Sequence, residues 1–257
     1  CLCFQALQAQ HIGLYNFEEF DLAHKAGVPG VYKMFQDTTG VIWFGSTNGI
    51  YRYDGNRVYE FSAEQKILLG KTKYSFLQDN NGDVLIGSDY GICRYSLKHN
   101  NIKLLVHLNR VFNDRSRYYP ICFDNTGALW FVASGKGIGN YKDEKVSWVQ
   151  NPPEIPDGSV AKVTDVFYNL PTNEIYLANY LSTQTAVFNL GTKTFTLDKQ
   201  HNTGSFVFVR NTLYRVLSNR IQSIDMATGE KHTYIAPYNA AVADNILYSR
   251  SVLLDEW

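Results

Sequence analysis

The 257-residue sequence lacks several features that mark large protein classes. It has only four cysteines and no apolar run of 18 residues, so no segment of it reads as a helical membrane span. Its 24 basic and 24 acidic residues give a formal charge of zero, which argues against a nucleic-acid partner because phosphate backbones require a basic surface. No segment sustains a 3.6-residue apolar period, and Ala63–Lys73 could hold only one helical turn.

Catalytic and metal-binding patterns are also missing. The six histidines are scattered, no pair has His-x3-His spacing, and no cysteine pairs with a nearby histidine, so we predict no metal and no cofactor. There is no Gly-x-Ser-x-Gly sequence. Ser134–Gly139 is faintly similar to a phosphate-binding loop but lacks Ser or Thr after Lys136, so we interpret it as a hairpin turn. We therefore expect this chain not to be an enzyme.

What the sequence does contain is a repeated phrase. Residues 36–53 read Gln-Asp-Thr-Thr-Gly-Val-Ile-Trp-Phe-Gly-Ser-Thr-Asn-Gly-Ile-Tyr-Arg-Tyr, residues 78–95 repeat the pattern, and residues 123–138 carry a more divergent copy. The matching glycines Gly40, Gly82 and Gly127 are 42 and 45 residues apart. A period of about 40–50 residues with four strand-like segments per unit is typical of a β-propeller.

The first unit divides into four predicted strands separated by turn signals. The strands are Val31–Gln36, Val41–Gly45, Ile50–Tyr53 and Arg57–Ser62. Asp and Gly residues in the first turn, and the Asp-Gly pair in the third, favour tight reversals of the chain.

Weaker units follow at residues 163–197 and 206–235, and a sixth begins near Ala241 and breaks off at Trp257. The predicted fold class is all-β, a propeller of four-stranded antiparallel blades. About six blades are visible in the sequence, the last incomplete. We expect six or seven blades in the full ring, because a closed ring covers its sheet edges.

Residues that recur in every unit are expected to serve the fold, whereas a binding site uses residues that differ between units. We expect the recurring carboxylates to organise their turns and the tryptophans to pack between sheets. We expect the recurring arginines to pair with a neighbouring carboxylate or carbonyl. These residues are Asp37, Asp79 and Asp124, Trp43 and Trp130, and Arg52 and Arg94.

The first nine residues are apolar and then small, which is typical of the end of a signal peptide, and we predict cleavage after Ala9. The alternative is an ordinary frayed strand. With residues 1–9 as a leader remnant, residues 10–257 form the propeller, truncated at its C-terminus. Cys93 and Cys122 then remain, in strands of neighbouring repeats, and we expect buried free thiols, with one disulfide as the alternative.

Candidate binding residues lie in the parts that do not repeat. Propellers bind ligands at one mouth of the central channel, which is lined by loops between units and between the second and third strands. The longest such loop, His107–Arg117, is followed by two tyrosines, and this mixture of cations and aromatic faces suits a sugar or a carboxylate. A solvated loop is the plainer interpretation. The candidates are Arg115, Arg117, Tyr118, Tyr119 and, from a longer polar turn, Tyr180.

The repeat closely resembles the two-component-regulator propeller repeat, whose unit reads roughly Asp-x-x-Gly-x-aliphatic-Trp-aliphatic/Phe-Gly-Thr-x-x-Gly-Leu-x-Arg-aromatic-Asp. Residues 36–55 match it almost fully, and Gly27–Gly30 stands where that family often has Gly-Leu-Pro. Leu85 replaces the Trp in the second copy, and Val132 replaces the Gly in the third.

The resemblance implies the periplasmic sensor domain of a membrane histidine kinase, often from Bacteroidetes-like bacteria. Sensors of this kind are dimeric, and some detect oligosaccharides from polysaccharide breakdown. We therefore expect an oligosaccharide or another small extracellular ligand, a homodimer, and an inner-membrane anchor through a segment beyond this sequence.

Two other functions stay open from the residues alone. Streptogramin-lyase-like propellers share the Asp-x-x-Gly-x-aliphatic-Trp turn, although a lyase would need His, Glu and Arg side chains to converge at the channel mouth. A scaffold for protein–protein contacts would need no small ligand.

Overall fold

The computed structural model describes most of the chain between Gly27 and Ile235. The described residues are 27–28, 30–70, 74–107, 117–149, 163, 165–178, 185–198, 205–209, 212–217, 220–225 and 228–235. The predicted leader remnant and the predicted sixth unit lie outside them.

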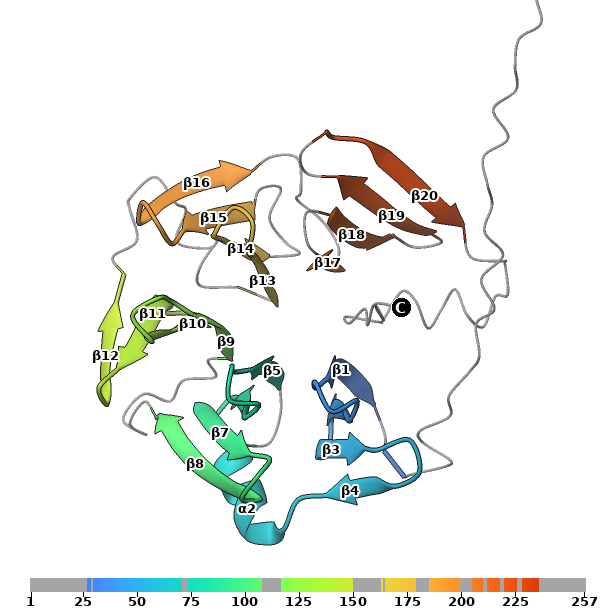
Figure 1. Ribbon diagram of the computed structural model, residues 1–257, viewed down its shortest axis with the longest axis vertical. Helices are drawn as coiled ribbons and strands as arrows, with labels where there is room; N and C mark the ends of the chain where they lie inside the picture. Colours follow the sequence, from blue (N-terminus) through green and yellow to red (C-terminus); the bar gives the residue numbers. More distant parts are fainter. Residues whose placement is uncertain are drawn as a thin grey trace, which may run out of the picture.

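Within this part of the chain, twenty strands form five four-stranded antiparallel sheets, each built from four consecutive strands. Figure 1 shows the five sheets arranged as blades around a central axis, with the first strand of each blade innermost and the fourth outermost. The predicted all-β propeller is confirmed for these five blades. The number of blades beyond five stays a prediction.

The strand bounds agree with the expected repeat units to within a few residues. Blade 1 comprises β1 (Val31–Gln36), β2 (Ile42–Ser46), β3 (Gly49–Tyr53) and β4 (Val58–Glu60). Blade 2 comprises β5 (Ser75–Gln78), β6 (Val84–Gly87), β7 (Ile92–Ser96) and β8 (Asn101–Val106). Blade 3 comprises β9 (Tyr118–Phe123), β10 (Leu129–Ala133), β11 (Gly137–Lys142) and β12 (Lys145–Trp148).

The last two described blades follow the same order. Blade 4 comprises β13 (Asp165–Asn169), β14 (Glu174–Ala178), β15 (Thr185–Asn189) and β16 (Thr194–Asp198). Blade 5 comprises β17 (Ser205–Val209), β18 (Thr212–Leu217), β19 (Arg220–Asp225) and β20 (Lys231–Ile235).

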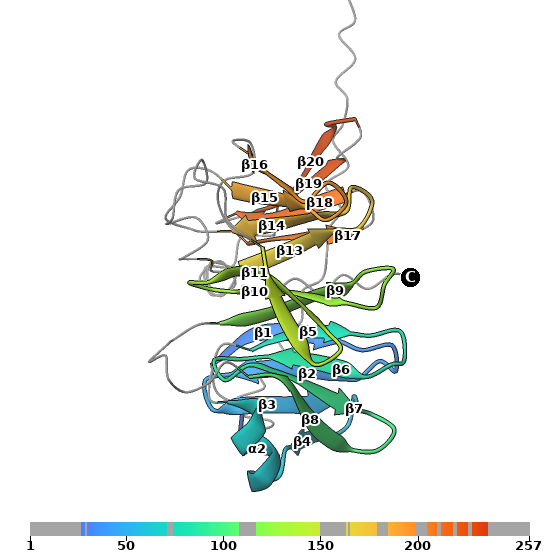
Figure 2. The ribbon, with the colours of Figure 1, turned by 90° about the vertical axis from the view of Figure 1, so that its left-hand side faces the viewer.

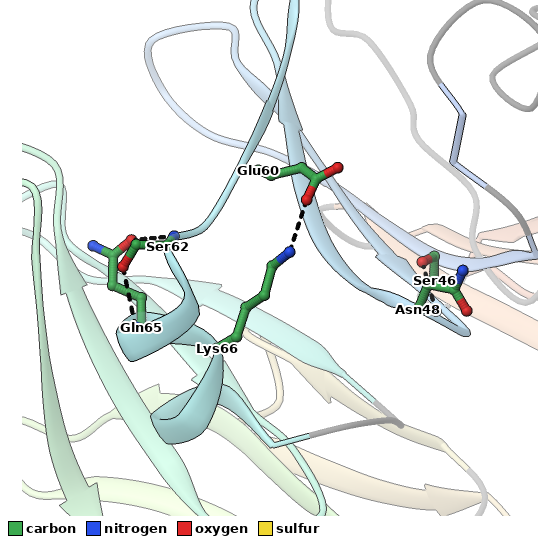
Figure 3. A network of polar contacts seen from close by, with 6 residues as sticks. All are labelled: Ser46, Asn48, Glu60, Ser62, Gln65 and Lys66. Atoms are coloured by element: carbon green, nitrogen blue, oxygen red, sulfur yellow. Dashed lines mark hydrogen bonds and ion pairs between the residues drawn. The ribbon is translucent and has the colours of Figure 1, made fainter.

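A short helix, α2 (Ala63–Leu69), connects blade 1 to blade 2 and is longer than the single turn expected from the sequence. It lies on the outer side of the ring near β4 and β8, as the edge-on view also shows (Figure 2). A capping box stabilises its start, since Ser62 and Gln65 exchange side-chain-to-backbone hydrogen bonds (Figure 3). Among the described residues no helix is long and apolar enough to cross a membrane.

The apolar cores lie between the faces of neighbouring blades. Trp43 of β2, fully buried, packs against blade 2, and Trp130 of β10 packs against blade 4. The expectation that both tryptophans pack between sheets is therefore confirmed. Blades 2, 3 and 4 each contribute residues to two cores, one with each neighbouring blade.

Both cysteines of the described region are buried and free, as the sequence predicts. Cys93, in β7, donates its thiol to the carbonyl oxygen of Leu68 at the end of α2, with 3.1 Å between sulfur and oxygen. Burial raises the pKa of each thiol to about 12. The two thiols therefore behave as small apolar side chains.

Candidate functional site

The turns that join the first and second strands of the blades lie at one end of the ring. In blade 1, Asp37 Oδ1 accepts hydrogen bonds from the backbone N–H groups of Thr39 and Val41, at 2.9 and 3.1 Å. Its Oδ2 accepts from the indole Nε1 of Trp43 at 2.8 Å. The turn and the neighbouring strand therefore already use both oxygens of this carboxylate.

Blade 3 repeats this arrangement with Asp124, whose Oδ2 accepts from Trp130 Nε1 at 2.8 Å. Partial burial opposes the charge on Asp124, but the hydrogen bonds from Thr126, Trp130 and the backbone of Ala128 outweigh it and lower its pKa to about 2. Asp79 Oδ1 likewise accepts from the N–H groups of Asn81 and Asp83, so the expectation that the recurring aspartates organise their turns is confirmed.

Blade 2 differs because Leu85 stands where blades 1 and 3 have tryptophan. Asp79 Oδ2 has no hydrogen-bond partner and instead lies 3.3 Å from Nη2 of Arg94. The expectation that the recurring arginines pair with a carboxylate is confirmed for Arg94.

The same expectation is wrong for Arg52. Its guanidinium lies over aromatic rings, and its Nη1 donates to the hydroxyl of Tyr95 at 2.6 Å. The physical reason is a difference between the blades. In blade 2, Arg94 faces Oδ2 of Asp79, but in blade 1 the indole N–H of Trp43 already occupies the corresponding Oδ2 of Asp37.

Antiparallel pairing places the loops between blades and the turns between second and third strands at the opposite end of the ring. At the junction of blades 2 and 3, this end is held by direct backbone contacts. The N–H of Tyr118 donates to the carbonyl oxygen of Ser88 at 3.1 Å, and the hydroxyl of Ser75 donates to the carbonyl oxygen of Tyr118 at 2.7 Å. A Cβ atom at Gly87 would lie 2.0 Å from that carbonyl, so only glycine permits this approach. The junction is therefore a rigid base.

Two aromatic side chains lie on this base. The rings of Tyr90, in the β6–β7 turn, and His107, after β8, have centroids 4.7 Å apart, and both residues are partly exposed. Gly70, which follows α2 with φ +74°, lies so close to this turn that a Cβ there would be 2.6 Å from Asp89 Oδ1. The helix end therefore helps to position the turn that carries Asp89 and Tyr90.

The predicted binding residues fall into different environments. Arg117 lies directly before β9, is partly exposed, and accepts a hydrogen bond on its carbonyl from the N–H of Ser134 at 2.9 Å. Arg115 and Tyr180 lie outside the described residues. Tyr118, the neighbour of Arg117, bonds to Ser88, so the backbone of Arg117 lies beside the junction of blades 2 and 3.

Tyr118 and Tyr119 belong to the innermost strand of blade 3 and not to an open loop. They are exposed by only 4% and 7%, and they point to opposite faces, because side chains alternate along a strand. Tyr118 lies in the core with blade 2, and Tyr119 in the core with blade 4. Their rings are therefore engaged in packing, and binding by their remaining exposed edges stays a prediction.

Sequence reasoning missed Tyr90 and His107. A signal for Tyr90 exists, since the second repeat has Asp-Tyr-Gly where the first has Thr-Asn-Gly, and a large aromatic in a tight turn stands out. Among the described residues no cluster of His, Cys, Asp and Glu side chains could hold a metal. A partly exposed aromatic pair is suited to binding a polar ligand or a partner surface.

The sequence matches no family model and no curated protein. Solved structures do match. A catalytically inactive virginiamycin B lyase from Staphylococcus aureus, crystallised with quinupristin, is 18% identical with a TM-score of 0.57, over 82% of this chain and 72% of the lyase. The chain has the β-propeller fold.

Two extracellular domains from B. thetaiotaomicron have a similar fold, and their proteins, BT4673 and BT3049, are described as hybrid two component systems. The BT4673 domain is 17% identical with a TM-score of 0.57, over 84% of this chain and 32% of that domain. The BT3049 domain is 17% identical with a TM-score of 0.56, over 80% of this chain and 29% of that domain. This chain therefore spans about a third of those domains.

Proposed function

We propose that this chain is the sensing propeller of a two-component sensor histidine kinase and lies outside the cytoplasm. The observation that carries the proposal is the Asp-turn repeat. Its residues match the sensor-family unit in blades 1 and 2, and its fold is similar to that of two sensor extracellular domains. A leader peptide ending at Ala9 and an anchor in the inner membrane complete the proposal, which gives a periplasmic location.

The binding face is the end of the ring at the junction of blades 2 and 3. Arg117, Tyr90 and His107 supply a cation and aromatic faces there, and the backbone contacts of Tyr118 hold the base rigid. The ligand is an oligosaccharide or another small extracellular molecule. A homodimer passes the signal on, because a ligand shifts an equilibrium only when it binds two arrangements with different affinity.

The coding sequence beyond Trp257 tests the kinase assignment. A completed ring followed by an apolar helix of about 20 residues and a kinase module supports the proposal. A stop codon soon after the ring closes contradicts it.

Binding at the proposed face is tested by thermal unfolding in a library of oligosaccharides. A glycan that raises the Tm of the wild type should raise that of Tyr90→Ala and Arg117→Ala less. Arg57→Ala, at an exposed arginine in the turn before β4, is the matched control and should respond like the wild type. An equal response from all four proteins would exclude this face as the binding site.

A propeller lyase is the second candidate, favoured by the similarity to virginiamycin B lyase over most of both chains. Its test is incubation with quinupristin, followed by chromatography and tandem mass spectrometry, because opening a ring by elimination leaves the mass unchanged. Conversion to a linear product would favour the lyase, and an unchanged substrate would favour the non-catalytic sensor.

A further inference from the structure

At the junction of blades 1 and 2, the guanidinium of Arg52 lies against three aromatic rings. The central guanidinium carbon of Arg52 lies 5.5 Å from the ring centroid of Trp43, 5.1 Å from that of Phe61 and 4.9 Å from that of Tyr95. All three distances are within the range of about 6 Å over which a cation is attracted to the face of an aromatic ring.

The three rings form a cage that is built from both blades. Trp43 comes from β2, Phe61 follows β4, and Tyr95 comes from β7. Their centroids are 5.4 to 5.9 Å apart, with Tyr95 edge-on to the other two. The rings are exposed by 0%, 4% and 1%, whereas Arg52 itself is partly exposed, so the cation lies at the boundary between the core and solvent.

Hydrogen bonding to Arg52 is sparse in comparison. Nη1 donates to the hydroxyl of Tyr95, which in turn donates to Oδ1 of Asn100. Nε is buried and has no hydrogen-bond partner among the described residues. No carboxylate pairs with Arg52 in the described part of the chain, so the rings are its principal counterpart.

Blade 2 provides an internal comparison. Arg94 holds the position in its blade that Arg52 holds in blade 1, because Arg94 pairs with Leu85 across the strands as Arg52 pairs with Trp43. With leucine at that position the arginine turns to the carboxylate of Asp79. Trp43 therefore has two effects on Arg52, since its N–H occupies Oδ2 of Asp37 and its ring contacts the guanidinium.

We propose that this cage is a binding site for an organic cation, of the guanidinium or quaternary ammonium class, which the chain fills with its own Arg52. The guanidinium acts as a tethered ligand that joins blade 1 to blade 2. Removal of the Arg52 side chain leaves a site that a free cation of the same class can occupy.

The test is chemical rescue of Arg52→Ala, with tetramethylammonium chloride as the main probe and ethylguanidinium chloride as the second. Tetramethylammonium donates no conventional hydrogen bonds, so it reports the aromatic cage alone. Arg52→Ala should unfold at a lower temperature than the wild type. At about tenfold above its dissociation constant, each probe should raise the Tm of this variant by about 3–6 °C, with saturation. The wild type should not respond.

Arg94→Ala is the matched control, because Arg94 faces a carboxylate and lacks the cage. Tetramethylammonium should not rescue this variant, and sodium chloride at equal ionic strength should rescue neither. Failure of both probes to rescue Arg52→Ala, or an equal tetramethylammonium effect on both variants, would overturn the proposal.

If Arg52→Ala does not fold, NMR of the wild type decides the question. Ring currents should move the side-chain protons of Arg52 well upfield of those of the exposed Arg57, with assignment from the signals lost in Arg52→Lys. Side-chain shifts of Arg52 like those of Arg57 would overturn the proposal.

Discussion

Lys193, in the turn between β15 and β16 of blade 4, places its Nζ 3.9 Å from the ring centroid of Trp130 in blade 3. Blade 3 has Asn140 where blades 1 and 2 have Arg52 and Arg94, so a neighbouring blade supplies the cation. Trp43 and Trp130 thus share two contacts, an aspartate on the indole N–H and a cation on the ring.

The contact of Lys193 with Trp130 should contribute measurably to stability. Lys193→Met removes the charge but keeps the chain length, and it should lower the free energy of unfolding by about 0.5–1 kcal/mol. Lys193→Arg should retain most of the stability because the guanidinium can also lie over the ring. Urea unfolding followed by tryptophan fluorescence measures both variants, and equal stability of the two would contradict a cation–π contact.

Asp124 should make the fold sensitive to acid. Because the folded state lowers its pKa to about 2, the carboxylate stabilises the fold above its ordinary pKa of 3.8 and loses this effect as pH falls through the window between those values. Asp124→Asn should be less stable than the wild type at pH 6, and the difference should shrink at pH 2.5. Urea unfolding at both pH values checks this, and a difference independent of pH would refute it.

Asn169 should be a site where an apolar substitution is tolerated. Its side chain is fully buried, and neither its amide nitrogen nor its amide oxygen has a hydrogen-bond partner among the residues that the structure describes. Asn169→Leu removes two unsatisfied polar atoms at similar volume. It should leave the free energy of unfolding unchanged or raise it by up to about 2 kcal/mol. Asn169→Asp buries a charge and should destabilise. A leucine variant as unstable as the aspartate variant would imply a polar partner for Asn169 in solution.

The thiols of Cys93 and Cys122 should react only when the protein unfolds. Desolvation by burial raises the pKa of each to about 12, so almost no thiolate forms at pH 8. In a variant with serine at positions 1 and 3, a thiol reagent should modify neither cysteine in buffer and both in concentrated urea. Rapid labelling of the native protein would show that the blade junctions open.

Much of the fold is readable from the sequence because the repeat unit is local. Turn residues such as Asp37 and Gly40 determine where the chain reverses, and strand alternation determines which residues face the core. The seven-residue helix α2 is longer than the single turn that the sequence predicts. Its stability comes from the Ser62 cap and from contacts with β8, and an apolar period contributes little.

The candidate site was less predictable. Tyr118 and Tyr119 looked like loop residues because they follow a long polar segment, yet strand pairing with β10 draws both into the wall of the ring. Tyr90 and His107 are 17 residues apart in the sequence, and only the packing of the β6–β7 turn against the end of β8 brings their rings together.

The sequence by itself determined the kind of fold, since a phrase repeated every 40–50 residues can bury its apolar faces only by stacking copies of the same sheet. It also determined the role of the turn aspartates, whose hydrogen bonds reach no further than six residues along the chain. Tertiary structure alone decided the partners of the cations. Arg52, Arg94 and Lys193 have long flexible side chains, and their final contacts depend on which rings and carboxylates the neighbouring strands and blades present.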